Sequence, residues 1–329
     1  MKCSMISCKV CGEPNRTIPI NSFRSIDAVN HFAVFTGAEK SNEFEEHIRK
    51  LWASDECEIY LCQECESRFA IPHVAGDAKF YGFLPPATYP DQRWEFKLTS
   101  GAVLDLLKGG GNLLEIGGGQ GHFVNKLINL GLKADQITVT EFSESAAKSL
   151  KLLGVNVAQV DFRSGLEGKK FQVIILFQTL EHLDNLSDVI NKLSELGLHG
   201  ANLFISVPNV TNIIWSEKNL GIPDMPPNHI TSFSAEGLRK LFLKSNWQIV
   251  DLQLQDTYSL SARWKQSAMR TLIFPTGLTQ KFLSKILVPE TSRYRKISLV
   301  ICAGLAIIVN PSWVRKVPPE NIWIHLKKL

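Results

Sequence analysis

The feature that most constrains this chain is a glycine-rich turn that joins a short apolar strand to a helix. The turn lies in the segment Leu113-Leu114-Glu115-Ile116-Gly117-Gly118-Gly119-Gln120-Gly121-His122-Phe123. Glycine permits a positive φ angle and lets a ligand approach the backbone closely, because it has no Cβ atom. The helix, expected from Gln120 to Leu130, would direct unpaired N–H groups and a partial positive charge towards the turn. The sequence therefore predicts a ligand-binding turn at the end of a β-strand, with a purely structural turn as the plain alternative.

The spacing of the glycines separates two classes of ligand. A dinucleotide site has the pattern Gly-x-Gly-x-x-Gly, but His122 stands where its third glycine would be. The order acid-x-Gly-x-Gly-x-Gly resembles instead the turn of class I S-adenosylmethionine (SAM) methyltransferases. This resemblance implies a Rossmann-like, doubly wound α/β sheet and a SAM site that includes Glu115, Gly117, Gly119 and Gly121. A nicotinamide oxidoreductase is the competing enzyme class, and His122 disfavours it.

Strand and helix patterns alternate after the turn with short connections, as a parallel doubly wound sheet requires. The expected strands cover residues 137–140, 155–160, 171–177, 201–207 and 247–254, and the expected helices cover 91–107, 186–196 and 234–243. Residues 171–177 are apolar almost throughout, as expected for a central strand that is covered on both faces. The resemblance implies that residues 321–326 form an antiparallel last strand.

Three polar residues follow expected strands, at the edge where a parallel sheet binds its ligands. Glu141 lies 20 residues beyond Gly121, and its two acceptor oxygens suit the ribose hydroxyls of a cofactor. A solvated cap of the next helix is the alternative for Glu141. For Asp161 the resemblance implies a hydrogen bond from the adenine amino group, although an ordinary turn also fits. Gln178, which we count among the cofactor residues, opens a segment that resembles the "(L)EH" segment after strand four of ubiquinone-type methyltransferases.

Two histidines are candidates for the acceptor side of the site. His182 follows the fourth expected strand, and His229 lies in a long connection, residues 209–231, that has little periodicity. Long loops of this kind are usually functional, and Pro226-Pro227-Asn228-His229 resembles a loop of polysaccharide-cluster methyltransferases. Either histidine suits general-base catalysis near neutral pH, or a structural role in shaping the pocket. The expected acceptor is a small molecule or a sugar that is methylated on oxygen or carbon.

Two Cys-x-x-Cys pairs near the N-terminus predict a structural zinc site. Cys8 and Cys11 form the first pair, and Cys62 and Cys65 form the second. Four thiolates complete a tetrahedral site that is closed to substrates. The 50 residues between the pairs exceed the roughly 15–20 of a compact zinc ribbon, although closing a longer loop costs little more. The alternatives are reduced thiols without a metal, or substitute ligands from Cys3, Cys57 or His73.

A proline-rich stretch at residues 85–90 divides the chain into two parts. The first is a zinc-ribbon-like module at residues 1–84, and the second is a methyltransferase domain at residues 91–329. Part of the module is expected to be helical, because apolar side chains between Phe44 and Trp52 share one face. Zinc ribbons of this kind precede the methyltransferase domain in some sugar methyltransferases, which the N-terminus resembles.

A basic helical insertion is expected near the C-terminus, at about residues 258–318. From Thr257 onward, lysine and arginine far outnumber aspartate and glutamate. The apolar run at residues 297–309 is shorter than the roughly 20 residues that span a bilayer, and its basic flanks suit contact with a membrane surface. A helical cap on the domain, or a dimer contact, is the plainer alternative. Nucleic-acid binding is disfavoured, because the basic residues lack interleaved aromatic side chains.

Composition bears on the compartment and on the overall interpretation. The seven cysteines are an odd number, which does not suggest a secreted disulfide framework, and the first residues lack the apolar core of a secretory signal. The cytoplasm is therefore the expected location. The sequence predicts a SAM-dependent methyltransferase with structural Zn²⁺, and a zinc-stabilised SAM-binding protein without turnover is the non-enzymatic alternative. It leaves the acceptor and the oligomeric state open.

Overall fold

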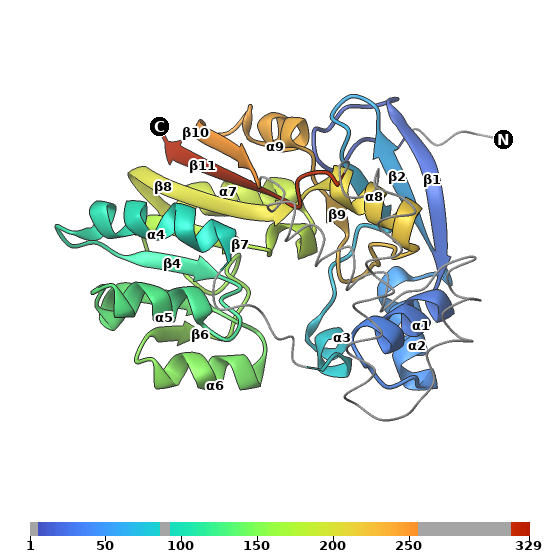
Figure 1. Cartoon of the computed structure of the whole chain (residues 1–329), viewed down its shortest axis with the longest axis horizontal. Helices are drawn as coiled ribbons and strands as arrows, with labels where there is room; N and C mark the ends of the chain where they lie inside the picture. Colours follow the sequence, from blue (N-terminus) through green and yellow to red (C-terminus); the bar gives the residue numbers. More distant parts are fainter. Residues whose placement is uncertain (1–5, 86–92, 256–316) are drawn as a thin grey trace, which may run out of the picture. The chain divides into compact units, whose positions relative to one another are not determined.

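The structure is a computed structural model in which residues 6–85, 93–255 and 317–329 are described. The chain divides into a larger unit, formed by Met1–Pro208, Met225–Gln253 and Ile322–Leu329, and a smaller one, formed by Asn209–Asp224 and Leu254–Asn321. The larger unit contains two sheets (Figure 1). Only two end residues of their strands, Leu254 and Asn321, are assigned to the smaller unit. The candidate site is built in this larger unit.

The larger sheet has seven strands in the order β6-β5-β4-β7-β8-β11-β10 (Figure 1). These strands are β4 (Leu113–Ile116), β5 (Ile137–Thr140), β6 (Asn156–Ala158), β7 (Phe171–Phe177), β8 (Gly197–Pro208), β10 (Trp247–Leu254) and β11 (Asn321–Lys328). Neighbouring strands from β6 to β8 run parallel. The chain moves outward from β4 to β6 and then returns to the other side of β4 with β7. The glycine turn therefore lies at the topological switch point, where parallel sheets bind ligands.

β11 runs opposite to β8, because the end of β11 lies beside the start of β8. The Lys328 ammonium donates to the Gly197 carbonyl at 2.8 Å, and His325 Nε2 lies 2.8 Å from Asn202 Oδ1. The antiparallel last strand that the resemblance implies is therefore present. It extends two residues beyond the expected 321–326.

Helices cover both faces of the large sheet. α4 (Trp94–Leu107), α5 (His122–Asn129) and α6 (Glu144–Leu152) pack on one face, and α7 (Leu186–Leu196) and α9 (Ala235–Phe242) pack on the other. Along β7, Val173 and Ile175 point to the first face, whereas Ile174 and Leu176 point to the second. The sheet is therefore doubly wound, as the sequence predicts. A short 3-10 helix, Ala134–Gln136, leads into β5.

The N-terminal module has a sheet of its own, with antiparallel strands in the order β1-β2-β3-β9. Its elements are β1 (Thr17–Arg24), α1 (Ser25–Phe35), α2 (Asn42–Trp52), β2 (Glu56–Cys62), β3 (Arg68–Ile71), α3 (Ala78–Phe83) and β9 (Thr231–Ser232). Phe32, Phe44 and Phe80 meet in the core of the module, with ring centroids 5.2–6.0 Å apart. The expected helix between Phe44 and Trp52 is α2. The long insert between the cysteine pairs is thus an ordered β-α-α-β unit.

β9 shows that residues 1–84 do not enclose the whole module. Thr231 pairs with Phe69 of β3, and Met225 and Ile230 are buried in the core of the module. The pairing satisfies backbone groups that β3 would otherwise leave at an open edge. A strand of two residues has no detectable period, which is why the sequence pattern assigns this segment to a loop of the second domain.

The connection expected at residues 209–231 contains a helix, α8 (Val210–Leu220). The Asn209 side chain caps it by accepting a hydrogen bond from the Thr211 N–H, and Gly221 ends it with a φ of 66°. Both end signals are present in the sequence. The expectation of a connection without regular structure is therefore wrong for these residues.

Several other element boundaries differ from the expected ones. α5 begins at His122 instead of Gln120, because Gly119 and Gly121 have positive φ angles that a right-handed helix does not accept. β6 is shorter than the expected strand at residues 155–160, and β8 begins four residues before the expected 201. α4 begins at Trp94, and residues 86–92 before it lie outside the described part.

The basic insertion expected at about residues 258–318, with its apolar run at 297–309, lies almost wholly outside the described residues. Within the described ranges, every helix is too short or too polar to cross a membrane. The insertion and its contact with a membrane surface stay predictions.

Gly237 in α9 lies against Ser67 of the N-terminal module, where the module packs on a helix of the large sheet. A Cβ atom at this position would lie 1.9 Å from Ser67 Oγ and 3.2 Å from Ser67 Cβ. The Ser67 hydroxyl accepts a hydrogen bond from the Ser234 N–H and cannot turn away without losing it. We expect Gly237→Ala to lower the free energy of unfolding by about 1–3 kcal/mol, as overpacking does, measured by urea denaturation.

Gly101→Ala is the matched control, because Gly101 also lies inside a helix. No neighbouring atom lies within 4 Å of its added Cβ. Alanine should raise the free energy of unfolding there by up to about 1 kcal/mol, since it is the better helix former. Equal effects of the two substitutions would contradict the packing described for Gly237.

Candidate active site and metal centre

The glycine turn after β4 combines close packing with one open position. Gly117, Gly119 and Gly121 have φ angles of 74°, 53° and 80°. A Cβ atom at Gly117, Gly118 or Gly121 would lie 2.3–2.8 Å from a neighbouring side chain, whereas nothing lies within 4 Å of one at Gly119. Three of the glycines are therefore required by the fold itself. Gly119 is the position at which a ligand has access to the backbone.

Glu141, which follows β5, closes over this open position. Its Oε2 accepts a hydrogen bond from the Gly119 N–H at 2.8 Å, and its Oε1 accepts one from the Ser143 N–H at 2.8 Å. The structure thus brings together the two residues that the sequence assigns to one cofactor site. The helix-cap alternative is also partly correct, but each carboxylate oxygen keeps a second acceptor position for a ligand.

Glu115 lies in β4 beneath the turn and is buried. Burial raises the pKa of its carboxyl to about 8, with a further increase from the negative charge of Glu141, and the nearby Arg93 guanidinium opposes the shift. Arg93 also pairs with the buried carboxylate of Glu95 at 2.8 Å. Two carboxyl groups therefore lie beside the turn, those of Glu115 and Glu141, and Glu115 holds its proton at neutral pH.

Gln178, directly after β7, has a backbone conformation that is unusual for a residue with a side chain. Its φ is 53°, its N–H donates to the Ser206 carbonyl at 2.8 Å, and its Nε2 donates to Ser206 Oγ at 3.3 Å. Left-handed conformations of this kind cost free energy and cluster at functional sites. Thr179, the next residue, donates its hydroxyl hydrogen to the Ile116 carbonyl beside the glycine turn. Gln178 thus lies at the carboxyl end of the strand adjacent to β4, as expected.

Asp161 lies three residues past β6 and forms an ion-pair cluster. Both of its carboxylate oxygens accept hydrogen bonds from the Arg163 guanidinium, the shortest at 2.6 Å, and Arg163 also contacts Asp184 at 2.8 Å. Burial works against ionisation of Asp161, but the hydrogen bonds from Arg163 outweigh it and lower its pKa. No local sequence pattern indicates this pairing. The assignment of Asp161 to the adenine amino group stays a prediction.

The two histidines that the sequence offers as alternatives lie next to each other. His182 ends a 3-10 helix, Leu180–His182, and its ring centroid lies 4.7 Å from that of His229 in an edge-to-face arrangement. His182 Nδ1 lies 2.7 Å from the Asn228 carbonyl oxygen and 3.2 Å from the Tyr81 hydroxyl. Tyr81 belongs to α3 of the N-terminal module, and no sequence pattern singles it out. Residues of both modules therefore surround the two histidines.

Backbone hydrogen bonds hold the segment around His229 in place. The Ile230 N–H donates to the Glu181 carbonyl at 3.0 Å, and the Ala70 N–H of β3 donates to the Ile230 carbonyl at 2.8 Å. The Gly76 N–H donates to the Pro227 carbonyl at 3.1 Å. The segment is thus fixed on both sides, which gives His229 a defined position opposite His182.

The four cysteines of the two Cys-x-x-Cys pairs converge. Cys8 Sγ lies 3.7 Å from Cys65 Sγ, Cys11 Sγ lies 3.7 Å from Cys62 Sγ, and all four sulfurs lie within 4.8 Å of one another. A disulfide would require about 2.05 Å, whereas sulfurs around one tetrahedral zinc ion lie roughly 3.8 Å apart, given Zn–S bonds of about 2.3 Å. The cluster therefore has the donor atoms and the spacing of a tetrathiolate metal site.

The backbone around the two pairs follows one pattern. The Gly12 N–H donates to the Cys8 carbonyl at 3.0 Å, and the Glu66 N–H donates to the Cys62 carbonyl at 2.8 Å. Glu66 takes the left-handed conformation that Gly12 takes in the first turn, with φ angles of 58° and 76°. The absence of a second glycine in the sequence therefore does not change the turn.

Protonation and the alternative ligands agree with this assignment of the cluster. The hydrogen bond from Cys8 is the main reason that the pKa of the Cys65 thiol falls, to about 5, so that one thiolate exists at neutral pH. Cys57 and His73 lie outside the cluster, His73 within 2.8 Å of the Thr231 hydroxyl. Cys3 lies outside the described residues.

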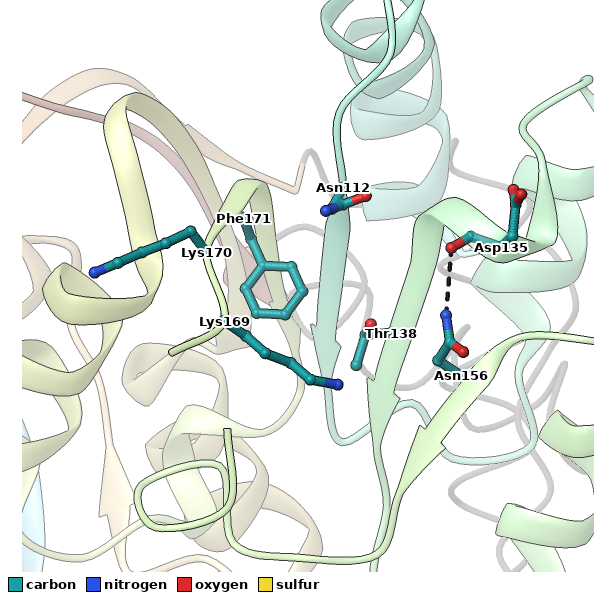
Figure 2. Close-up of a pocket in the computed structure, with 7 residues that line it drawn as sticks. All are labelled: Asn112, Asp135, Thr138, Asn156, Lys169, Lys170 and Phe171. Atoms are coloured by element: carbon teal, nitrogen blue, oxygen red, sulfur yellow. Dashed lines mark hydrogen bonds between the residues drawn. The ribbon is translucent and has the colours of Figure 1, made fainter. Parts of the chain in front are cut away.

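A hollow at the opposite edge of the large sheet is not part of this site. Figure 2 shows its lining, which includes Asn112 before β4, Asp135 before β5 and Asn156 at the start of β6. These residues mark the amino ends of the parallel strands, whereas ligands bind at the carboxyl ends. The glycine turn, Glu141, Gln178 and His182 all lie at the carboxyl ends.

Residues 92–252 match the family model described as "Methyltransferase domain". The match covers the glycine turn and the first five strands of the large sheet, and it ends within the sixth, β10. This part of the chain is similar to that family, and its sheet has the Rossmann-like, doubly wound arrangement. The N-terminal module and the C-terminal residues lie outside the match, and a comparison with curated protein sequences finds no match.

Three solved structures illustrate the similarity. A SAM-dependent methyltransferase from Archaeoglobus fulgidus is 17% identical over 71% of this chain and 94% of that chain, with a TM-score of 0.45. The N-methyltransferase NodS from Bradyrhizobium japonicum, in complex with S-adenosyl-L-homocysteine (SAH), is 12% identical over 72% and 89%, with a TM-score of 0.40. Coclaurine N-methyltransferase, bound to N-methylheliamine and SAH, is 14% identical over 71% and 72%, with a TM-score of 0.43. Similarity at this level carries no argument about the acceptor of this chain.

The raised pKa of Glu115 predicts a pH dependence of stability. The ordinary pKa of the Glu115 carboxyl is 4.5, and in the folded protein it is about 8. Between these two pH values, the folded state holds a proton that the unfolded state has lost. The free energy of unfolding should therefore fall as the pH rises through this window, by at most about 1.4 kcal/mol per pH unit. Glutamine resembles the protonated carboxyl, so Glu115→Gln should lack this contribution and become more stable than the wild type towards pH 8. Calorimetric melting of both proteins from pH 4.5 to 8.5 measures the difference, and a difference independent of pH would contradict the assignment.

Proposed function

We propose that the protein is a SAM-dependent methyltransferase that transfers a methyl group to oxygen or carbon of a small-molecule or sugar acceptor. The observation that carries the proposal is the contact between Glu141 and the open Gly119, at the switch point of a methyltransferase domain. A turn that is close-packed at three glycines and open at the fourth fits a ligand that lies against the backbone. The carboxylate of Glu141 beside the open glycine fits a ribose with two hydroxyl donors.

Each proposed cofactor residue has a distinct task. Glu141 holds the ribose hydroxyls, Gly119 gives access to the backbone, and Gln178 borders the site from the adjacent strand. Asp161 accepts the adenine amino group with the acceptor positions that Arg163 leaves. Glu115, Gly117 and Gly121 support the shape of the turn from below. When bound, the cofactor supplies an electrophilic methyl group on a sulfonium.

The acceptor side has the chemistry to take up a proton. A hydroxyl or a carbon acid must lose its proton as it accepts the methyl group, and an imidazole near neutral pH is a suitable base. The Asn228 carbonyl and Tyr81 orient the ring of His182, and backbone hydrogen bonds fix the position of His229. Positioning of the nucleophile in line with the methyl group supplies a further large part of the acceleration.

We also propose that Cys8, Cys11, Cys62 and Cys65 hold one structural zinc ion. The sulfur spacing and the paired turns support this proposal. Because all four ligands come from the protein, the ion would stabilise the module and would not meet the acceptor.

The cofactor assignment is tested by the effect of SAH on thermal unfolding. A ligand that binds only the folded state stabilises it by about 2.7 kcal/mol at 100 times its dissociation constant, so SAH should raise the melting temperature and NAD should not. Gly119→Val fills the open position and should abolish the shift. Glu141→Gln keeps the size of the side chain and should weaken SAH binding at least tenfold, as loss of a charged hydrogen bond does.

Glu144→Gln is the control for Glu141→Gln, because Glu144 lies three residues further along and its exposed carboxylate pairs with Lys148. That substitution should leave SAH affinity unchanged. A shift with NAD and none with SAH would overturn the proposed cofactor.

The zinc assignment is tested by element analysis of cysteine variants. Replacing Cys62 and Cys65 together with serine should remove one zinc ion per chain, and should loosen the N-terminal module, because metal affinity there contributes to folding. The SAH-induced shift should remain, since the glycine turn lies in the other module. Cys57→Ala is the control, because Cys57 is buried outside the cluster. Equal zinc contents in the wild type and the double variant would refute the site.

A further inference from the structure

We propose that Glu181, His182 and His229 form a second metal site, which binds one divalent first-row transition-metal ion on the acceptor side. The proposal rests on the proposed function only in calling this side the acceptor side. The ligands come from the 3-10 helix after β7 and from the segment that precedes β9.

The three side chains converge on one point. Each offers a ligand atom, and these atoms all lie within 4.8 Å of one another. Ligand atoms around one ion lie roughly 3–4 Å apart when the metal–ligand distances are about 2.0–2.2 Å, so small rotations of the side chains bring all three onto an ion. Among the described residues, the four-cysteine cluster is the only other group of at least three such ligands.

The tautomer of His182 suits a metal ligand. Its Nδ1 lies 2.7 Å from the Asn228 carbonyl oxygen, which can only accept a hydrogen bond, so Nδ1 carries the hydrogen. In the neutral ring, Nε2 then keeps the lone pair that a metal requires. Histidines that bind metals characteristically donate their other N–H to a carbonyl or carboxylate in this way.

The backbone keeps the ligands together before any ion binds. The Ile230 N–H donates to the Glu181 carbonyl at 3.0 Å. His229 precedes Ile230 and His182 follows Glu181, so this hydrogen bond places the two histidines side by side. The His229 N–H donates to the Met225 carbonyl at 3.3 Å. A preorganised set of ligands needs little rearrangement, which favours binding.

Charge and donor type indicate the class of ion. The Glu181 side chain is buried, with 1% of the residue exposed, and a buried carboxylate is stabilised by a cation. Two imidazole nitrogens and one carboxylate oxygen suit Zn²⁺, Fe²⁺ or Co²⁺, whereas Mg²⁺ and Ca²⁺ prefer oxygen ligands alone. Three protein ligands also leave coordination positions open, as in catalytic sites and unlike the closed cysteine cluster.

An ion at this place points to acceptors with an oxygen donor at or beside the methylated atom. A hydroxyl that binds a divalent ion becomes more acidic, as metal-bound water does. The two histidines would then promote loss of the acceptor's proton through the ion instead of taking it directly.

The test uses Co²⁺ as a probe, because its visible spectrum reports the ligands. The protein is first given one equivalent of Zn²⁺, which the four thiolates take, and is then titrated with Co²⁺. We expect one further cobalt ion per chain, with visible ligand-field bands and without the ultraviolet charge-transfer band of a thiolate ligand. His229→Ala and Glu181→Gln should each weaken Co²⁺ binding at least tenfold. His199→Ala removes an exposed imidazole in β8 and should leave it unchanged.

Melting with and without SAH separates the possible failures. Variants that keep the SAH-induced shift are folded, so a loss of Co²⁺ in them reports on the ligands. If wild-type protein binds cobalt but not SAH, the proposed function fails and the metal site stands. The metal site is overturned if no cobalt binds beyond the cysteine cluster, or if the Glu181 and His229 variants bind it as the wild type does. The three side chains would then form a hydrogen-bonded cluster only.

Discussion

The arrangement of the two histidines depends on one residue, Ile230, whose backbone forms hydrogen bonds with two distant parts of the chain. Its carbonyl accepts from the Ala70 N–H of β3, and its N–H donates to the Glu181 carbonyl after β7. Both bonds are buried, and an unpaired buried backbone group costs free energy. The segment therefore cannot leave either partner without loss, and His229, next to Ile230, is held opposite His182. The N-terminal module is thus part of the site and not merely attached to it.

The same segment is connected to the cysteine cluster through the start of α9. The Ser234 hydroxyl donates to the Cys65 carbonyl, and the Ser234 N–H donates to Ser67 Oγ at 3.1 Å. The Ser67 carbonyl in turn accepts from the Cys62 N–H at 2.9 Å. A zinc ion at the cysteines would therefore fix the far end of the segment that carries His229. The ion would therefore affect the position of His229, and its loss would leave the glycine turn intact.

The sequence predicts most of the large sheet because the signals for it are local. Glycine spacing, apolar strands and helix periodicity place β4, β5 and β7 correctly, and Glu141 meets Gly119 as expected. The features it misses depend on pairing between distant residues. Tyr81 reaches His182 from another module, β9 has no period of its own, and Arg163 joins Asp161 to Asp184 only after folding. α8 is different, since Asn209 and Gly221 mark its ends in the sequence and a closer reading of those signals predicts it.

The carboxyl groups around the glycine turn give the donor side a charge preference of its own. The pKa of Glu115 is raised mainly because burial disfavours its anion, and Glu141 adds to this effect. A cationic ligand in the turn would favour the anion and lower that pKa. Coupling between two binding events is reciprocal, so the ionised form of Glu115 would in turn favour a cationic ligand over a neutral one. SAM carries the sulfonium charge and SAH does not. A buried acid beneath the turn therefore provides a physical means to hold SAM more tightly than SAH, and the preference grows as the pH rises towards the pKa of Glu115.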